Sequence, residues 1–377
     1  MKRPYVVIFV LILTLALTAA LLSACNDKHT HTADVVCTVS EREVLLTYSC
    51  SCGATASSLT AEFTGRTGET VTLSPDEEGR INCSTLSGEF GVAVKLDGTV
   101  LYETDAVFKP SVYNTAVAGY DYTEGDEIEH ITYYSSVAGA DKHANVVLPP
   151  DYDPEKRYPV LYLLHGLMSD EYSWLDGVYG LPMGAQYIVQ NACYFDGTPE
   201  MIVVCVNSLV NATETEPEWS MLPPSAPPEL AETYDLTGRD IVECLMPYVN
   251  SHYSTLTGKD NTAIAGYSMG GREAMLTAFD YQDVFGWVGA FSSASFGENV
   301  VSSSTYVPDF TLDEGSDGFR YVQITVGMLD TLAPVSSGIC DKLDAIDVEY
   351  TYESVFGMHD PSVWRGALKT FVQNIFR

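Results

Sequence analysis

The stretch Ala263-Ile264-Ala265-Gly266-Tyr267-Ser268-Met269-Gly270-Gly271 places a Gly-x-Ser-x-Gly motif directly after a short apolar run. Residues 272–278 follow it and are mostly helix formers, so the sequence predicts a strand, a sharp turn and a helix. This order is typical of a nucleophile elbow, where glycines allow a strained turn that exposes the serine hydroxyl. The alternative is a tight glycine turn with an idle serine, and the flanking strand and helix patterns argue against it. Ser268 is therefore the predicted nucleophile.

A serine hydroxyl becomes an effective nucleophile only beside a base. The sequence contains seven histidines, and His359 is the one that follows Ser268. In the chain order nucleophile, acid, base of α/β-hydrolases the base comes last, so His359 is the predicted base. Asp330 follows the predicted strand at 321–326, at the carboxyl edge of the sheet, and we predict that it orients His359. The rival carboxylates lie in a predicted helix, at the start of a strand or beside the base itself: Asp344, Asp347, Glu349 and Asp360.

Acyl chemistry at a serine also needs two backbone N–H groups that stabilise the oxyanion. Met269, directly after the nucleophile, is expected to supply one of them. The second should come from a loop after an early strand, and Leu167 fits because it follows the apolar run at 159–164. His165, which begins this loop, is expected to support it and not to act as the base.

The chain from residue 113 to residue 377 alternates apolar strands with helical stretches. The runs at 159–164 and 201–206 are continuously apolar, which suits strands buried on both faces of a mostly parallel sheet. Ile241–His252 has the pattern of a helix between two such strands. The sequence therefore predicts an α/β domain with a mostly parallel central sheet at 113–377.

Residues 34–112 have a different texture, with short β-rich segments and few helical patterns. Asp97-Gly98 between two such segments is a strong hairpin signal. The number and length of these segments predict a small immunoglobulin-like β-sandwich, which we interpret as an accessory domain. Its expected role is that of a spacer, and glycan binding is the alternative.

The amino terminus has the features of an export signal. Lys2 and Arg3 precede an apolar run at 5–22, and Leu22-Ser23-Ala24-Cys25 resembles a bacterial lipobox. We predict a signal peptide at 1–24, a lipid-bearing Cys25 and a polar tether at 25–33. An uncleaved membrane anchor is the alternative. The predicted location is the surface or membrane of a bacterium, with the lipid as the one membrane contact.

Charge and cysteine content limit the partners and cofactors. The formal net charge of −32 at pH 7 opposes binding to the phosphate backbone of nucleic acid. Eight of the nine cysteines remain after Cys25, and an exported protein permits disulfides whose connectivity stays open. Cys50-Ser51-Cys52 lacks the spacing of a zinc knuckle, so no metal and no cofactor are predicted.

Residues 128–377 resemble the esterase family of α/β-hydrolases that includes feruloyl esterases, acetylxylan esterases, S-formylglutathione hydrolases and mycolyltransferases. The matching stretches are ANVVLPPDY, YPVLYLLHG, AIAGYSMGGREA and GMHDPSVWRGAL. The resemblance implies the α/β-hydrolase fold. It also implies a catalytic triad of Ser268, Asp330 and His359, with oxyanion donors at Leu167 and Met269.

One segment departs from the family pattern. Residues 211–232 form a Pro-rich acidic insertion at the expected active-site edge, and Trp219 lies within it. We predict that Trp219 binds substrate from a lid, with a solvated surface loop as the alternative.

The resemblance, closest to the feruloyl-esterase branch, implies a serine carboxylic-ester hydrolase that works through an acyl-enzyme. The expected substrates are carbohydrate-linked esters, such as feruloyl or acetyl esters of plant polysaccharide. An acyltransferase with the same triad and a non-catalytic glycan-binding lipoprotein are the alternatives.

Overall fold

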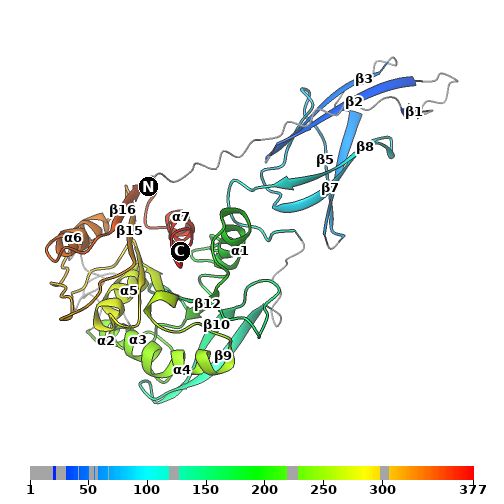
Figure 1. Cartoon of the computed structure of the whole chain (residues 1–377). Helices are drawn as coiled ribbons and strands as arrows, with labels where there is room; N and C mark the ends of the chain where they lie inside the picture. Colours follow the sequence, from blue (N-terminus) through cyan, green and yellow to red (C-terminus); the bar gives the residue numbers. More distant parts are fainter. Residues whose placement is uncertain are drawn as a thin grey trace, which may run out of the picture. The chain divides into compact units, whose positions relative to one another are not determined.

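The chain divides into two compact units, Met1–Asp121 and Tyr122–Arg377, which are described separately (Figure 1). The computed structural model describes residues 20–22, 31–40, 42–50, 55, 58–66, 68–118, 127–218, 228–297 and 305–377. Within these residues, no helix combines the length and the apolar character needed to cross a bilayer.

In its described part, the first unit contains two four-stranded sheets in which every strand pair is antiparallel. The first sheet has the order β1 (Ala20–Leu22), β2 (His31–Val39), β3 (Glu43–Cys50) and β6 (Arg80–Asn82). The second has the order β5 (Thr70–Leu73), β4 (Leu59–Gly65), β7 (Gly88–Leu96) and β8 (Thr99–Phe108). β1 falls within the predicted signal peptide. β2 begins three residues before the predicted start of the sandwich, so the end of the predicted tether is strand.

Side chains that alternate along the strands form the core of this unit. Along β4 every second residue is buried, and the ring of Phe63 meets the ring of Phe108 edge to face at 5.5 Å. The predicted hairpin is confirmed, since Leu96 pairs with Thr99 around Asp97-Gly98. Both turn residues have positive φ, 48° and 80°, as a two-residue hairpin turn of type I′ requires.

The second unit is built on an eight-stranded sheet, counted over its described residues, with the order β16-β15-β14-β13-β11-β12-β10-β9. β9 pairs antiparallel with β10, β10 pairs antiparallel with β12, and the other neighbours are parallel. This confirms the mostly parallel sheet. The strands are β9 (Ile128–Ser135), β10 (Ala140–Val147), β11 (Val160–Leu164), β12 (Ile202–Val206), β13 (Thr262–Tyr267), β14 (Trp287–Phe291), β15 (Tyr321–Gly327) and β16 (Thr351–Val355).

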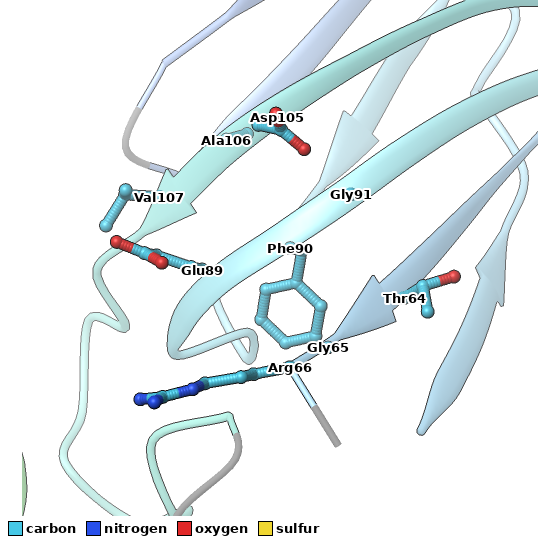
Figure 2. A pocket seen from close by; sticks show the side chains of 9 residues that line it. All are labelled: Thr64, Gly65, Arg66, Glu89, Phe90, Gly91, Asp105, Ala106 and Val107. Atoms are coloured by element: carbon cyan, nitrogen blue, oxygen red, sulfur yellow. The ribbon is translucent and has the colours of Figure 1, made fainter. Parts of the chain in front are cut away.

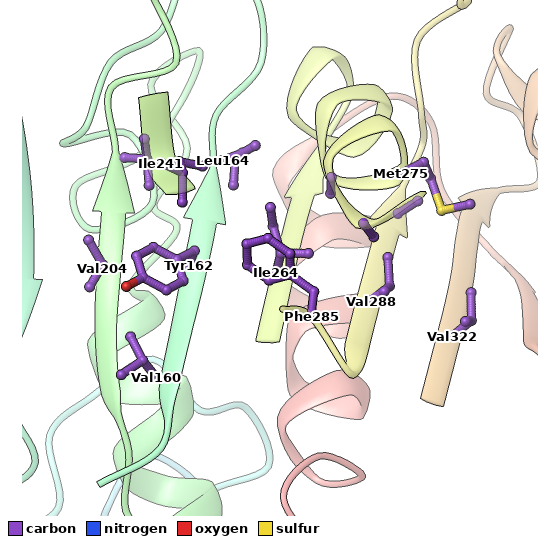
Figure 3. Close-up of a cluster of buried hydrophobic side chains, with 14 of the residues drawn as sticks. Val160, Tyr162, Leu164, Val204, Ile241, Ile264, Met275, Phe285, Val288 and Val322 are labelled. Atoms are coloured by element: carbon purple, nitrogen blue, oxygen red, sulfur yellow. The ribbon is translucent and has the colours of Figure 1, made fainter. Parts of the chain in front are cut away.

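Helices cover both faces of this sheet. Ile264 of β13 and Met275 of α5 (Met269–Asp280) belong to one continuous apolar core on the first face (Figure 3). Ile339 of α6 (Ala333–Asp344) belongs to the same core. On the other face Trp364 of α7 stacks on Tyr267 with ring centroids 4.3 Å apart, and α1 packs beside α7. The helices are α1 (Ala185–Asp196), α2 (Pro228–Asp235), α3 (Thr237–Asp240), α4 (Met246–His252), α5 (Met269–Asp280), α6 (Ala333–Asp344) and α7 (Pro361–Val372), with a short 3₁₀ turn at Lys259–Asn261.

The segment predicted as a helix at 241–252 is helical. The helical segment starts earlier, at Thr237, and the first turn of the predicted range is a π-helix and not an α-helix. Residues Ile241–Leu245 form a π-helix, in which the Met246 N–H donates to the Ile241 carbonyl. Pro247 follows and has no N–H to donate, so the regular bond pattern cannot continue at this point.

Candidate active site

Ser268 occupies a sharp turn between β13 and α5. Its φ of 55° and ψ of −117° lie outside the favoured regions for a residue with a side chain, and its N–H donates to the Phe291 carbonyl at 2.8 Å. A Cβ added at Gly266 would lie 2.3 Å from the Gly270 oxygen, and one at Gly270 would lie 2.2 Å from the Leu164 oxygen. Glycines are therefore required on both sides of the serine, as the motif predicts.

The structure brings the three residues predicted as nucleophile, acid and base together. Nε2 of His359 lies 2.9 Å from Oγ of Ser268, and Nδ1 of His359 lies 2.9 Å from Oδ2 of Asp330. Asp330 follows the end of β15, and His359 lies between β16 and α7. The ring of Trp364 meets the His359 ring edge to face at 5.1 Å, which supports the imidazole from one side.

Asp330 has the surroundings of an ionised carboxylate. Its side chain is 0% exposed, and burial alone would raise its pKa. The hydrogen bond and charge of His359 and the Leu332 N–H, which donates to Oδ1 at 2.8 Å, outweigh burial and lower the pKa of Asp330 below its usual range. A carboxylate only accepts hydrogen bonds, so Nδ1 of His359 carries the proton. Nε2, the other ring nitrogen, is then placed to accept the Ser268 hydroxyl.

Asp360, the alternative acid that adjoins His359 in sequence, caps a helix instead. Its Oδ1 accepts the Ser362 N–H at 2.8 Å and its Oδ2 accepts the Met358 N–H at 3.1 Å, so it caps the start of α7.

The loop expected to supply an oxyanion donor lies against the nucleophile. A Cβ added at Gly166 would lie 3.1 Å from Cβ of Ser268. Leu167 follows Gly166 and packs on a small apolar cluster that includes Met269, the first residue of α5. Both predicted donor residues thus adjoin Ser268 in space.

His165 does not reach the nucleophile and supports the loop, as expected. Its Nδ1–H donates to the Gly166 carbonyl at 2.7 Å, while its Nε2 accepts the Ser208 N–H at 3.0 Å. Burial lowers the pKa of His165 to about 4, so the ring is neutral at physiological pH.

Sequence reasoning missed an exposed apolar rim beside Asp330 and His359. The backbone N–H of Met328 donates to Val355 at 2.7 Å, and that of Leu329 donates to Gly357 at 2.9 Å, so the two loops are joined by main-chain bonds. Four large apolar side chains on these loops are at least 60% exposed: Met328, Leu329, Phe356 and Met358. Short apolar runs after strand ends were the signal that could have revealed this rim.

The insertion at 211–232 is described at 211–218 and at 228–232, where it is not loop but the start of α2, and the predicted substrate contact Trp219 lies outside the described residues. Two acidic side chains of its first half make contacts that the sequence did not suggest. Glu214 binds His143 on β10, and Glu216 accepts the Met168 N–H of the loop that carries Leu167. Cys25 also lies outside the described residues.

Metal-ligating side chains are dispersed. Across the part of the chain that the structure describes, no group of three His, Cys, Asp or Glu residues could hold a metal ion. The described cysteine side chains are free thiols, namely Cys37, Cys83, Cys193, Cys205, Cys244 and Cys340, and the question of a bond at Cys50 or Cys52 lies outside them.

The first unit has a groove of its own. It encloses about 550 Å³ along β4, β7 and β8, and the charged side chains of Arg66, Glu89 and Asp105 line it (Figure 2).

The family model described as "Putative esterase" matches residues 135–375. The chain belongs to this esterase family. The match spans the eight-stranded sheet from the end of β9 to β16 and includes Ser268, Asp330 and His359.

Individual relatives of the chain agree with the family assignment. An endo-1,4-β-xylanase/feruloyl esterase of Xylanibacter ruminicola is 28% identical over 260 residues, which are 66% of this chain and 31% of the relative. An esterase of Mycobacterium tuberculosis is 28% identical over 183 residues, 46% of this chain and 33% of the relative. The chain therefore matches less than two thirds of the length of each of these relatives.

Solved structures show the same fold. A ferulic acid esterase of family CE1 from Anaeromyces mucronatus has a TM-score of 0.57 at 30% identity, over 71% of this chain and 96% of that chain. The feruloyl esterase module from Clostridium thermocellum has a TM-score of 0.51 at 17% identity, over 71% of this chain and 92% of that chain. The second unit thus has the α/β-hydrolase fold with a mostly parallel sheet.

Proposed function

We propose that this esterase hydrolyses carboxylic esters of carbohydrates by a Ser-His-Asp mechanism. The observation that carries the proposal is the continuous hydrogen-bonded chain from Asp330 through His359 to Ser268. An imidazole that accepts the serine hydroxyl on one nitrogen and is held by a carboxylate on the other is the arrangement that activates a serine nucleophile.

The reaction follows from these contacts. Oγ of Ser268 attacks the ester carbonyl carbon while Nε2 of His359 takes the hydroxyl proton. The N–H groups of Leu167 and Met269 stabilise the negative oxygen of the tetrahedral intermediate. His359 then gives its proton to the leaving alcohol, and an acyl-enzyme forms on Ser268. Water, deprotonated by His359, hydrolyses this acyl-enzyme and restores the serine.

The substrate proposal rests on the relatives and on the rim of the site. The Anaeromyces mucronatus esterase was solved in complex with ferulic acid, an aromatic acid. In this chain the apolar rim places Phe356, 86% exposed, three residues before the base. Such a surface suits the aromatic ring of a feruloyl group or the apolar face of a sugar. We extend the proposal to Trp219, which would add a second aromatic contact.

The remaining parts of the chain fit an exported carbohydrate esterase. We propose that the first unit is an immunoglobulin-like accessory domain, because its described strands form two four-stranded antiparallel sheets, β1-β2-β3-β6 and β5-β4-β7-β8, in which β3 pairs with β6 and β4 pairs with β7. The lipobox at Cys25 supports export and attachment to a membrane through lipid.

A substrate panel tests the proposal. Purified protein should release ferulate or acetate from arabinoxylan or acetylated xylan, and acid from small aryl esters. A fluorophosphonate should label Ser268 and stop this release. Absence of both ester hydrolysis and labelling would contradict the proposal, and acyl transfer to an added sugar in preference to water would identify an acyltransferase.

A further inference from the structure

Leu167 lies between two peptide groups that are each held by a side chain. The first joins Gly166 to Leu167, and its carbonyl oxygen accepts the Nδ1–H of His165 at 2.7 Å. The carbonyl and the N–H of a trans peptide point in opposite directions. The bond to His165 therefore turns the Leu167 N–H away from His165.

The second peptide group joins Leu167 to Met168, and the insertion holds it. The Met168 N–H donates to Oε1 of Glu216 at 2.6 Å, across 48 positions of sequence. Met168 has a φ of 57°, a left-handed conformation that a residue with a side chain seldom adopts without external restraint. The Glu216 contact supplies such a restraint.

A second hydrogen bond, from Tyr234, fixes the side chain of Glu216. The hydroxyl of Tyr234 donates to the same Oε1 at 2.7 Å. Tyr234 belongs to α2, is fully buried, and its ring meets the His165 ring edge to face at 6.2 Å. His165, Tyr234 and Glu216 therefore surround the loop that adjoins Ser268.

We propose that Glu216 is a positioning residue for the oxyanion site. By holding the Met168 N–H, Glu216 fixes the second peptide of Leu167, as His165 fixes the first, and so keeps the Leu167 N–H aimed at the oxyanion. The inference rests on the proposed function, in which Leu167 is an oxyanion donor. It gives the insertion a part in stabilising the transition state, in addition to any role as a cover.

Glu214 provides a matched control two residues away. It accepts the His143 N–H at 2.8 Å and lies 2.5 Å from Nδ1 of the same residue. These contacts tie the insertion to β10 and not to the oxyanion loop. A general need for an anchored insertion would affect Glu214 and Glu216 variants alike, whereas the proposal affects Glu216 alone.

The test uses the full-length protein with p-nitrophenyl acetate and the variants Glu216→Ala, Glu216→Gln and Glu214→Ala. The endpoint of fluorophosphonate labelling counts the folded, reactive serines, so that kcat is expressed per reactive Ser268. We expect Glu216→Ala to lower kcat about 10- to 100-fold with KM within about twofold, because a misaimed donor weakens transition-state binding. The rate of labelling should fall by a similar factor.

The variant Glu216→Gln separates the effect of the hydrogen bonds from the effect of the negative charge. The amide oxygen of Glu216→Gln can accept the same two hydrogen bonds, so its kcat should stay within about threefold of the parent, as should that of Glu214→Ala. Parent-like kcat in Glu216→Ala, equal losses in Glu214→Ala, or no rescue by Gln would each overturn the inference alone. An inactive, unlabelled parent protein would overturn the proposed function and the inference with it.

Discussion

Nε2 of His359 lies 2.9 Å from Oγ of Ser268, although 91 positions separate the two residues in the sequence. The elbow after β13 and the loop after β16 bring them together. Asp330 holds the other nitrogen of the ring, so the direction of proton transfer is set before a substrate binds.

Ser268→Ala should lower kcat for ester hydrolysis by about 10⁶-fold, because it removes the nucleophile itself. The change deletes one hydroxyl, so the circular dichroism spectrum and the thermal midpoint should match those of the parent. Steady-state kinetics and a melting curve check both statements. Retention of normal turnover in this variant would show that another residue performs the chemistry.

Asp330→Asn should reduce kcat by about 10⁴-fold while the protein stays folded. An amide nitrogen facing His359 would favour the tautomer with the proton on Nε2, which cannot accept the Ser268 hydroxyl. The control is Asp360→Asn, one residue after the base, where the cap of α7 is affected and kcat should fall less than about tenfold. Kinetics of the two variants side by side would reveal a reversed assignment of the acid.

Gly270→Ala should destabilise the protein by about 1–3 kcal/mol and lower kcat, since the new Cβ would lie 2.2 Å from the Leu164 oxygen. Relief of this clash requires movement of the backbone that leads into the oxyanion loop. Gly366→Ala is the control, because a Cβ at this exposed position of α7 meets nothing within 4 Å and should stabilise the helix by about 0.5–1 kcal/mol. Urea unfolding measures both effects, and similar values for the two variants would contradict the packing argument.

Glu273→Gln should flatten the pH dependence of stability in the acid-to-neutral range. Burial raises the pKa of Glu273 from 4.5 to about 7, although Arg272 donates to it and opposes the shift. Between these two values the folded state binds more protons than the unfolded state. The contribution of Glu273 to stability is therefore complete below 4.5 and is lost as the pH rises through about 7.

The difference in unfolding free energy between the parent and Glu273→Gln should accordingly change by at most about 1.4 kcal/mol per pH unit across this window. Urea denaturation at several pH values measures this difference. A difference that stays constant with pH would mean that Glu273 is ionised throughout.

Cys25→Ser should release the protein from membranes or leave an unprocessed precursor, because lipid attachment requires the thiol of the lipobox. Fractionation of the expressing bacterium and mass spectrometry of the mature amino terminus would measure this. A native protein that is wholly soluble after export, with a different first residue, would contradict the lipoprotein prediction.

The motif and the chain order were enough to predict that Ser268, Asp330 and His359 lie together. Each of these residues follows a strand of a parallel sheet, and the carboxyl ends of such strands meet at one edge. The position of Ser268, Asp330 and His359 in sequence therefore determined their position in space. The same reasoning predicted the buried runs of β11 and β12 to within one residue.

The contacts of the insertion could not be predicted in this way. Glu216 reaches Met168, and Glu214 reaches His143 across 71 positions, from a segment without helical or strand periodicity. In the sequence alone, carboxylates in such a segment cannot be told apart from solvated surface side chains. Their partners become known only when the fold brings the other segments next to them. The π-helix at 241–245 was also missed, because a helical pattern does not show where a proline interrupts the bonding of the preceding turn.

Asp330 and His359 lie on loops that are joined by main-chain hydrogen bonds, Met328 to Val355 and Leu329 to Gly357. Side chains at the rim take no part in these bonds. We therefore expect mutations there to change the preference among esters while the contacts among Asp330, His359 and Ser268 stay in place. For directed evolution this makes Met328, Leu329, Phe356 and Met358 the first positions to randomise when a new substrate preference is sought.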